Sequence, residues 1–130
     1  MLVYMLDTDI ASYVIKTRTK ELADKFIAES GRIALSEITL AELRFGATNH
    51  PTQPRYHHNL IDELTSRLEV IPWSASAHYG ELRFHLKKNR LDPMDLLIAS
   101  HALQQSLTLV TNNEKHFQRV PELRIENWTK

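Results

Sequence analysis

The chain has 130 residues, and its sixteen lysines and arginines balance its sixteen aspartates and glutamates, so the formal net charge at pH 7 is zero. The 42% hydrophobic and 25% charged residues are ordinary for one globular domain and exclude a disordered or fibrous chain. The absence of cysteine excludes disulfide scaffolds, thiolate catalysis, iron–sulfur clusters and thiolate zinc sites, and the absence of a long apolar run leads us to expect a soluble, cytoplasmic protein.

The first half of the sequence alternates short apolar runs with helical stripes. Residues 2–6 are apolar on both faces, as in a strand buried inside a parallel sheet, and the run stops at Asp7. Ser36 follows the second apolar run and is a typical helix cap. The predicted elements are a strand over 2–6, helices over 10–16 and 21–29, a strand over 33–35, a helix over 38–45 closed by Gly46, and a loop over 47–55.

The second half continues this alternation. Pro72 restricts its run to a sheet edge or a strand end, Ser74 is a candidate helix cap, and Pro93 suits the first turn of a helix. The predicted elements are a helix over 60–68, a strand over 70–73, helices over 74–86 and 94–105, a strand over 107–110 and an edge strand over 123–128. Strands separated by helices predict a single α/β domain over 1–130 with a mostly parallel sheet.

Three carboxylates and an amide occupy positions suited to a shared site. Asp7 and Asn113 come shortly after predicted strands, Glu42 lies one helical turn before Gly46, and Asp95 stands in the first turn of its helix. Ligands of open parallel sheets collect beyond the carboxyl ends of the strands, and Mg²⁺ or Mn²⁺ prefers oxygen ligands. Such a cation lowers the pKa of a bound water and neutralises charge on a phosphate oxygen.

Each of these four residues also has a plain structural interpretation. The alternatives are a helix cap for Asp7, a solvated helix position for Glu42, a helix-dipole partner for Asp95 and a turn position for Asn113. The spacing along the chain does not show that the four side chains converge.

Other catalytic motifs are missing from the sequence. Its three glycines exclude the glycine-rich phosphate loops, and neither a Gly-x-Ser-x-Gly elbow nor a His-Glu-x-x-His motif is present. We interpret four histidines as surface residues rather than zinc ligands: His57, His58, His78 and His85. The basic cluster of Lys87, Lys88 and Arg90 is either a solvated helix end or a phosphate-binding rim.

Four segments resemble a known family in their residues and in their order. They are MLDTD at 5–9, SEITLAEL at 36–43, DLLIASHA at 95–102 and VTNN at 110–113. Together with the length and the LRIENW segment at 123–128, they make essentially the whole chain similar to the PIN-domain ribonucleases, specifically the VapC-type toxins of type II toxin–antitoxin modules.

The resemblance implies a PIN-like three-layer α/β/α domain, metal-dependent endoribonuclease activity on structured RNA, and neutralisation by a cognate VapB-type antitoxin. The acidic positions of the family fall on Asp7, Glu42, Asp95 and Asn113. The first three would hold Mg²⁺ or Mn²⁺, and support would come from Thr8, Asp9 and Thr111. The resemblance further implies a homodimer, and relatives with the same Thr-Asn-Asn run include toxins that cut initiator tRNA in its anticodon loop.

Three departures from the family pattern leave other functions open. Asp9 stands where Asn is usual, Asp92 where Gly is common, and His116 where Asp or Glu is frequent. A PIN-like domain that binds partners without catalysis is therefore one alternative. A receiver domain with a phospho-acceptor aspartate is another, although residues 70–73 offer no acceptor.

Overall fold

The computed structural model describes residues 1–16 and 19–130, and its centre is a five-stranded sheet in which every pairing is parallel. The strands are β1 (Tyr4–Leu6), β2 (Ile33–Ser36), β3 (Glu69–Ile71), β4 (Thr108–Val110) and β5 (Ile125–Glu126). Their order in the sheet is β3-β2-β1-β4-β5, so β1 is central and β3 and β5 form the two edges.

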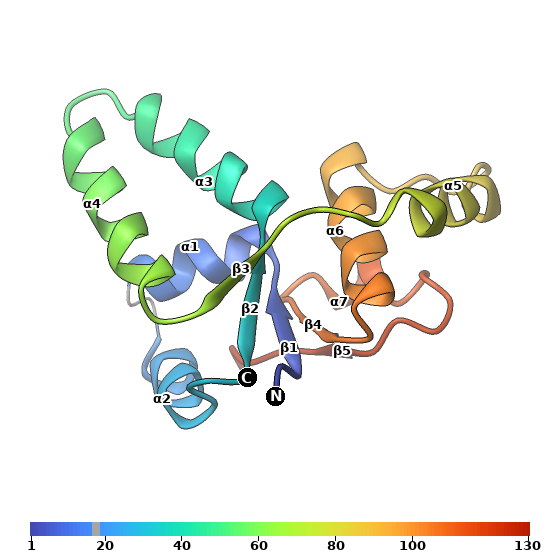
Figure 1. The fold of residues 1–130 in the computed structure, drawn as a ribbon, viewed down its shortest axis with the longest axis horizontal. Helices are drawn as coiled ribbons and strands as arrows, with labels where there is room; N and C mark the ends of the chain where they lie inside the picture. The colour runs from blue at the N-terminus through green and yellow to red at the C-terminus, as the bar shows by residue number, and fades with distance from the viewer. Residues whose placement is uncertain (17–18) are drawn as a thin grey trace.

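Seven helices in the described ranges surround this sheet. They are α1 (Thr8–Lys16), α2 (Lys20–Ala28), α3 (Glu37–Thr48), α4 (Pro54–Thr65), α5 (Ser76–His85), α6 (Pro93–Gln104) and α7 (Glu114–Phe117). Figure 1 shows α3 and α4 rising together on one side of the sheet's upper end and α5 and α6 on the other, with both chain termini at the lower end. None of these helices is long and apolar enough to cross a bilayer.

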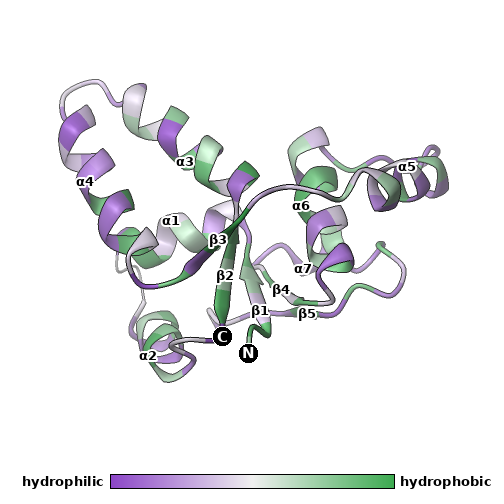
Figure 2. Ribbon diagram, in the orientation of Figure 1, coloured by the Kyte–Doolittle hydropathy of each residue, from purple (hydrophilic) through white to green (hydrophobic). Residues whose placement is uncertain are grey.

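The side chains of the strands alternate between two separate cores, which makes the domain three-layered. Tyr4 and Leu6 of β1 pack with buried residues of α1, α2, α3 and α4, whereas Met5 between them packs with α5, α6 and α7. In Figure 2 the central strands and α6 are among the most hydrophobic segments, while α4 is largely hydrophilic on its outer side. The predicted α/β/α class and parallel sheet are therefore confirmed.

Several helix boundaries differ from the prediction. Gly46 does not close α3, because the next residue, Ala47, extends the buried stripe and the helix runs to Thr48. The predicted loop is correspondingly shorter, since α4 already begins at Pro54, which occupies its first turn. Ser74 does not cap α5: the cap position is taken by Ala75, whose side chain is buried.

Two predicted helix starts are confirmed. The Ser36 hydroxyl accepts a hydrogen bond from the Ile38 N–H at 3.1 Å and caps α3. Asp92 caps α6 by accepting from the Met94 N–H at 3.0 Å, with a φ of −55° that needs no glycine. The departure from the family pattern at this position therefore leaves an ordinary helix start.

Candidate functional site

Asp7 lies at the centre of the carboxyl end of the sheet, directly after β1. Its N–H donates to the Val110 carbonyl at 3.0 Å, which continues the pairing of β1 with β4 by one residue. Its side chain is only 4% exposed, and Oδ1 accepts from the Ile10 N–H at 2.8 Å. Asp7 is therefore both the predicted helix cap and a buried anion.

Carboxylates at two further positions lie close enough to affect the ionisation of Asp7. Burial raises the pKa of Asp7 to about 6, hydrogen bonds from Thr111 and Ile10 oppose this shift, and the charges of Asp9 and Asp95 add to it. Burial likewise raises the pKa of Asp95, with smaller contributions of the same sign from Asp92, Glu42 and Asp9.

We call the group of Asp7, Asp9, Glu42 and Asp95 the acidic edge. Its members come from the end of β1, the first turn of α1, the middle of α3 and the first turn of α6. The mutual electrostatic effects mean that the fold brings together side chains that are far apart in the sequence.

Two outer carboxylates of the acidic edge, Glu42 and Asp95, have close polar neighbours. The Thr8 hydroxyl donates to Glu42 Oε1 at 2.6 Å and links α1 to α3. The His116 Nε2 lies 3.2 Å from Asp95 Oδ2, out of line for a hydrogen bond, and it lowers the pKa of Asp95 by its charge. His116 is thus part of the site, and its only signal in the sequence is its departure from the family pattern.

The donor set of the acidic edge fits a hard divalent cation. Within residues 1–16 and 19–130 no three Asp, Glu or His side chains already surround one point at ligand distance. Mg²⁺ in proteins commonly keeps several waters and uses only one or two carboxylates, so it does not require such a cage. Burial is the main cause of the raised pKa values of Asp7 and Asp95, and neighbouring carboxylates add smaller contributions of the same sign, which a bound cation would offset.

The remaining predicted site residues lie at different distances from this centre. Thr111 is fully buried next to Asp7, and its hydroxyl accepts from the Asn113 N–H at 2.9 Å. Asn113 is exposed at the start of α7, where its side chain makes no capping hydrogen bond. In the described part of the chain, no ion pair joins the acidic edge to the basic cluster of Lys87, Lys88 and Arg90, which follows α5.

A buried polar pair beneath the acidic edge was not predicted. His101 of α6 and Ser36 at the start of α3 are both fully buried, and His101 Nδ1 lies 2.8 Å from Ser36 Oγ. The pair connects the helix that carries Glu42 to the helix that carries Asp95. The only signal in the sequence is the position of His101 inside the apolar run of its helix.

Comparisons with known proteins show the family to which the chain belongs. The family model of the PIN domain matches residues 4–123. The chain is 42% identical over 135 residues to ribonuclease VapC2 of Rickettsia felis, covering 99% of this chain and 100% of that protein. It is 36% identical over 132 residues to the tRNA(fMet)-specific endonuclease VapC of Salmonella typhimurium, covering 98% and 99% of the two chains.

A solved structure extends the similarity to three dimensions. The crystal structure of DNA-bound VapBC from Salmonella typhimurium superposes with a TM-score of 0.93 at 36% identity, covering 98% of this chain and 99% of that chain. The agreement in sequence and in fold therefore covers nearly the full length of both chains.

Proposed function

This chain belongs to the PIN-domain family and, within it, to the VapC ribonucleases, the toxins of VapBC systems, and we propose that it hydrolyses structured RNA at its acidic edge with a divalent cation. The observation that carries the proposal is the convergence of Asp7, Glu42 and Asp95 from three separate elements. Gathering like charges in a partly buried place is unfavourable for the fold, and a requirement for cation binding accounts for it.

We expect Asp7, Glu42 and Asp95 to hold Mg²⁺ or Mn²⁺, directly or through water, with Asn113 and Asp9 in support. Such an ion supplies Lewis-acid activation of water and neutralisation of charge on the scissile phosphate when it is bound. The support for this assignment is a donor set composed of oxygens alone and the raised pKa of the innermost carboxyl group.

The other polar residues of the site orient these carboxylates. The hydroxyl of Thr8 fixes one oxygen of Glu42, and the hydroxyl of Thr111 holds Asp7 from the β4 side. His116 partly offsets the negative charge of Asp95. The site is therefore organised before a substrate arrives, which is how a small active site gains rate.

Structured RNA is the substrate class that we propose, with initiator tRNA as its first candidate. The support is the similarity to the endonuclease of Salmonella typhimurium, which is named as specific for tRNA(fMet). With a net charge of zero, the chain has no general excess of cations to hold RNA. Contacts to phosphates must therefore come from local groups, and the basic cluster of Lys87, Lys88 and Arg90 is one candidate.

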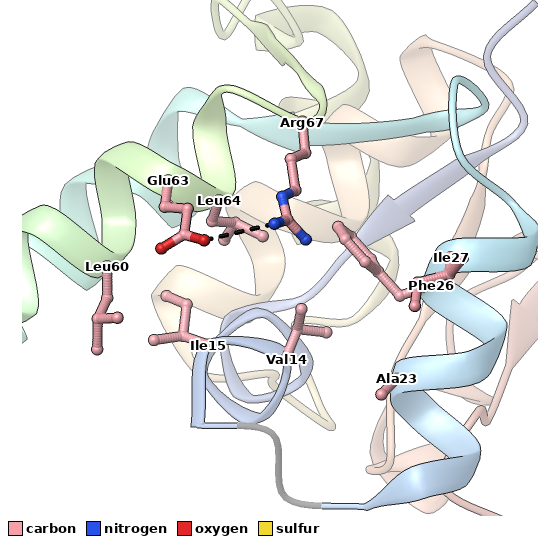
Figure 3. A pocket seen from close by; sticks show the side chains of 9 residues that line it. All are labelled: Val14, Ile15, Ala23, Phe26, Ile27, Leu60, Glu63, Leu64 and Arg67. Atoms are coloured by element: carbon pink, nitrogen blue, oxygen red, sulfur yellow. Dashed lines mark hydrogen bonds and ion pairs between the residues drawn. The ribbon is translucent and has the colours of Figure 1, made fainter.

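We propose that a cognate antitoxin neutralises the enzyme through an apolar groove between α1, α2 and α4. The groove has a volume of about 340 Å³ and is drawn in Figure 3. Its walls are Val14 and Ile15 of α1, Phe26 of α2 and Leu60 and Leu64 of α4. An amphipathic segment of the antitoxin matches this chemistry, because apolar anchors at helical spacing fit such grooves.

Charged and exposed groups at the rim of this groove add to the match. Glu63 and Arg67 pair across one side at 3.4 Å, as Figure 3 shows, and both remain available to polar groups of a partner. Ile27 of α2 lines the groove and is 67% exposed. A large exposed apolar side chain at such a rim favours a docking surface.

A homodimer is the assembly that we expect. Phe45 on α3 is 69% exposed and Phe84 on α5 is 70% exposed, and both helices belong to the pairs that flank the acidic edge. Covering two exposed phenylalanines stabilises an interface, because aromatic side chains are strong interface anchors.

The test of the nuclease proposal is cleavage of total RNA and of initiator tRNA with Mg²⁺ or Mn²⁺, and with EDTA. We expect cleavage with metal and none with EDTA, and we expect Asp7→Asn and Asp95→Asn each to abolish it while circular dichroism shows a folded protein. Glu81→Gln, which removes an exposed carboxylate on α5, is the matched control and should cleave normally. Cleavage by a folded Asp7→Asn/Asp95→Asn double variant would refute the proposal.

A wild-type protein that neither cleaves RNA nor is stabilised by Mg²⁺ or Mn²⁺ in a thermal melt would instead support a domain that only binds partners. A ligand of the native state must raise its stability, so the melt tests the cation site independently of cleavage.

A further inference from the structure

A second pocket opens from the acidic edge and runs between α1 and α3 to the beginning of α4. Its volume is about 280 Å³. It is lined along α1 by Thr8, Ser12 and Lys16, and along α3 and the turn after it by Glu42, Gly46 and His50. Both sets are spaced by four residues, so each follows one face of its helix over about 12 Å.

The two ends of this pocket differ in charge. One end is the acidic edge itself, where Thr8 donates to Glu42 at 2.6 Å. The other end carries Lys16, His50 and His57, all of which line the pocket. Desolvation lowers the pKa of His57, and the neighbouring charges of His50 and Lys16 lower it further, so these three groups lie close together.

The two histidine rings form an ordered aromatic surface. Their centroids are 4.1 Å apart and their planes are inclined by 33°. His50 Nδ1 accepts hydrogen bonds from the N–H groups of Thr52 at 3.3 Å and Gln53 at 3.0 Å, so the turn before α4 fixes the orientation of this ring. Fixed aromatic surfaces bind nucleobases by stacking, whatever the base.

The pocket is open beside Gly46, although Ile15, Leu43 and Ile61 also line it. A Cβ atom added at Gly46 would meet no heavy atom within 4 Å, so the space above this glycine is free. Ser12, half-buried on α1, contributes only a hydroxyl group to the same pocket. A volume near 300 Å³ is at the lower end of the range for small-ligand sites and suits one nucleotide.

We propose that this pocket binds the nucleotide next to the scissile phosphate, with its base against His50 and His57 and its far phosphate at Lys16. The proposal rests on the RNA hydrolysis proposed above, because the pocket begins at Glu42. An RNA chain that crosses the acidic edge would leave it along the two helix faces, and the basic end would receive the next phosphate. Protein recognition of unpaired RNA commonly combines such stacking with phosphate contacts.

The chemistry of the lining favours RNA over a segment of the antitoxin. The groove between α1, α2 and α4 has only two charged side chains among aliphatic and aromatic ones and suits an amphipathic peptide. This pocket has an apolar part, from residues such as Ile15 and Leu43, and adds hydroxyls, two carboxylates, an ammonium group and two imidazoles. The pocket between α1 and α3 is also continuous with the acidic edge through Glu42 and Asp9.

The first test is binding of mononucleotides in EDTA, which does not depend on cleavage. AMP, CMP, GMP and UMP are titrated into the wild-type protein while the ring protons of the histidines are followed by NMR. We expect the signals of His50 and His57 to shift with at least one nucleotide, and those of His78 and His85 on α5 to remain in place. No shift at His50 and His57 with any of the four nucleotides overturns the proposal.

The second test fills the pocket by Gly46→Leu, with Gly80→Leu as the matched control. Gly80 is also a helical glycine with open space around it, but it lies on α5 and outside the pocket. Stacking of one base contributes enough that we expect Gly46→Leu to raise the KM for RNA about tenfold or more. The stabilisation by Mn²⁺ in a thermal melt should be unchanged, and Gly80→Leu should keep the wild-type KM.

Two results of the second test contradict the pocket assignment. A wild-type KM for Gly46→Leu overturns it. The assignment is also overturned if Gly46→Leu cleaves RNA normally but resists the antitoxin, because the pocket would then bind the antitoxin rather than RNA. Failure of the wild-type protein to cleave RNA counts against the proposed nuclease function, and the nucleotide titration then still decides whether the pocket binds nucleotides.

Discussion

Replacing Asp7 by asparagine should stabilise the metal-free protein, and the gain should grow with pH. Burial raises the pKa of Asp7 from 3.8 to about 6, so the folded state holds this proton more tightly than the unfolded state. The stability contributed by the protonated group is fully present below pH 3.8 and is lost as the pH rises to 6. At 1.36 kcal/mol per pKa unit, the ionised carboxylate lowers the free energy of unfolding by about 3 kcal/mol above pH 6.

Asp7→Asn removes this titration and keeps an oxygen that can accept from the Ile10 N–H. Relative to the wild type in EDTA, the variant should gain about 1 kcal/mol in free energy of unfolding at pH 4.5 and about 3 kcal/mol at pH 7.5. Urea unfolding followed by circular dichroism measures both values. Glu81→Gln controls for the loss of one negative charge and should show no such trend.

An equal effect of Asp7→Asn at the two pH values would refute this reasoning, because it would mean that the carboxyl group at the end of β1 ionises as freely in the folded chain as in the unfolded one. A loss of stability that increases with pH would refute it more strongly, because it would reverse the sign of the linkage.

Three further changes test separate parts of the molecule. Ser36→Ala removes the cap of α3 and the partner of His101, so the free energy of unfolding in urea should fall by about 1–2 kcal/mol, and an unchanged value would contradict the role of this pair. His116→Gln removes the charge that lowers the pKa of Asp95, so the acid limb of the pH profile of RNA cleavage should move to higher pH. An unchanged acid limb would mean that His116 does not affect the ionisation of Asp95 in the active enzyme. Ile27→Glu at the rim of the apolar groove should weaken neutralisation by the antitoxin about tenfold or more in a titrated cleavage assay, whereas cleavage by the free toxin should not change.

Much of the fold could be predicted from local pattern, because strands buried on both faces and capped helices have strong signals. The exceptions occur where tertiary packing decides the boundary. Gly46 looks like a helix end, yet burial of Ala47 carries α3 past it. The short helix α7, at Glu114–Phe117, was not predicted, because four residues are too few for a helical period to be visible and its side-chain cap is absent.

The candidate site shows a different limit. The position of Asp7 after a strand and that of Glu42 within a helix could be read from the sequence. That the two belong to one site followed only from the family resemblance, because local pattern does not give the order of the strands in the sheet. For Asp7 the interpretation as a helix cap is confirmed by the hydrogen bond from the Ile10 N–H, and the same side chain is buried with a raised pKa. The pocket between α1 and α3 could not be predicted, because two helix faces and a turn that are far apart in the sequence must meet to form it.

The short outer strands of the sheet limit how this protein can associate with others. The edge strands β3 and β5 have three and two residues, so each offers very little unpaired backbone to an incoming strand. Edge-to-edge pairing of strands, through which exposed sheets aggregate, is therefore disfavoured. A protein that binds this domain therefore has more surface to contact on the helices than on the edges of the sheet.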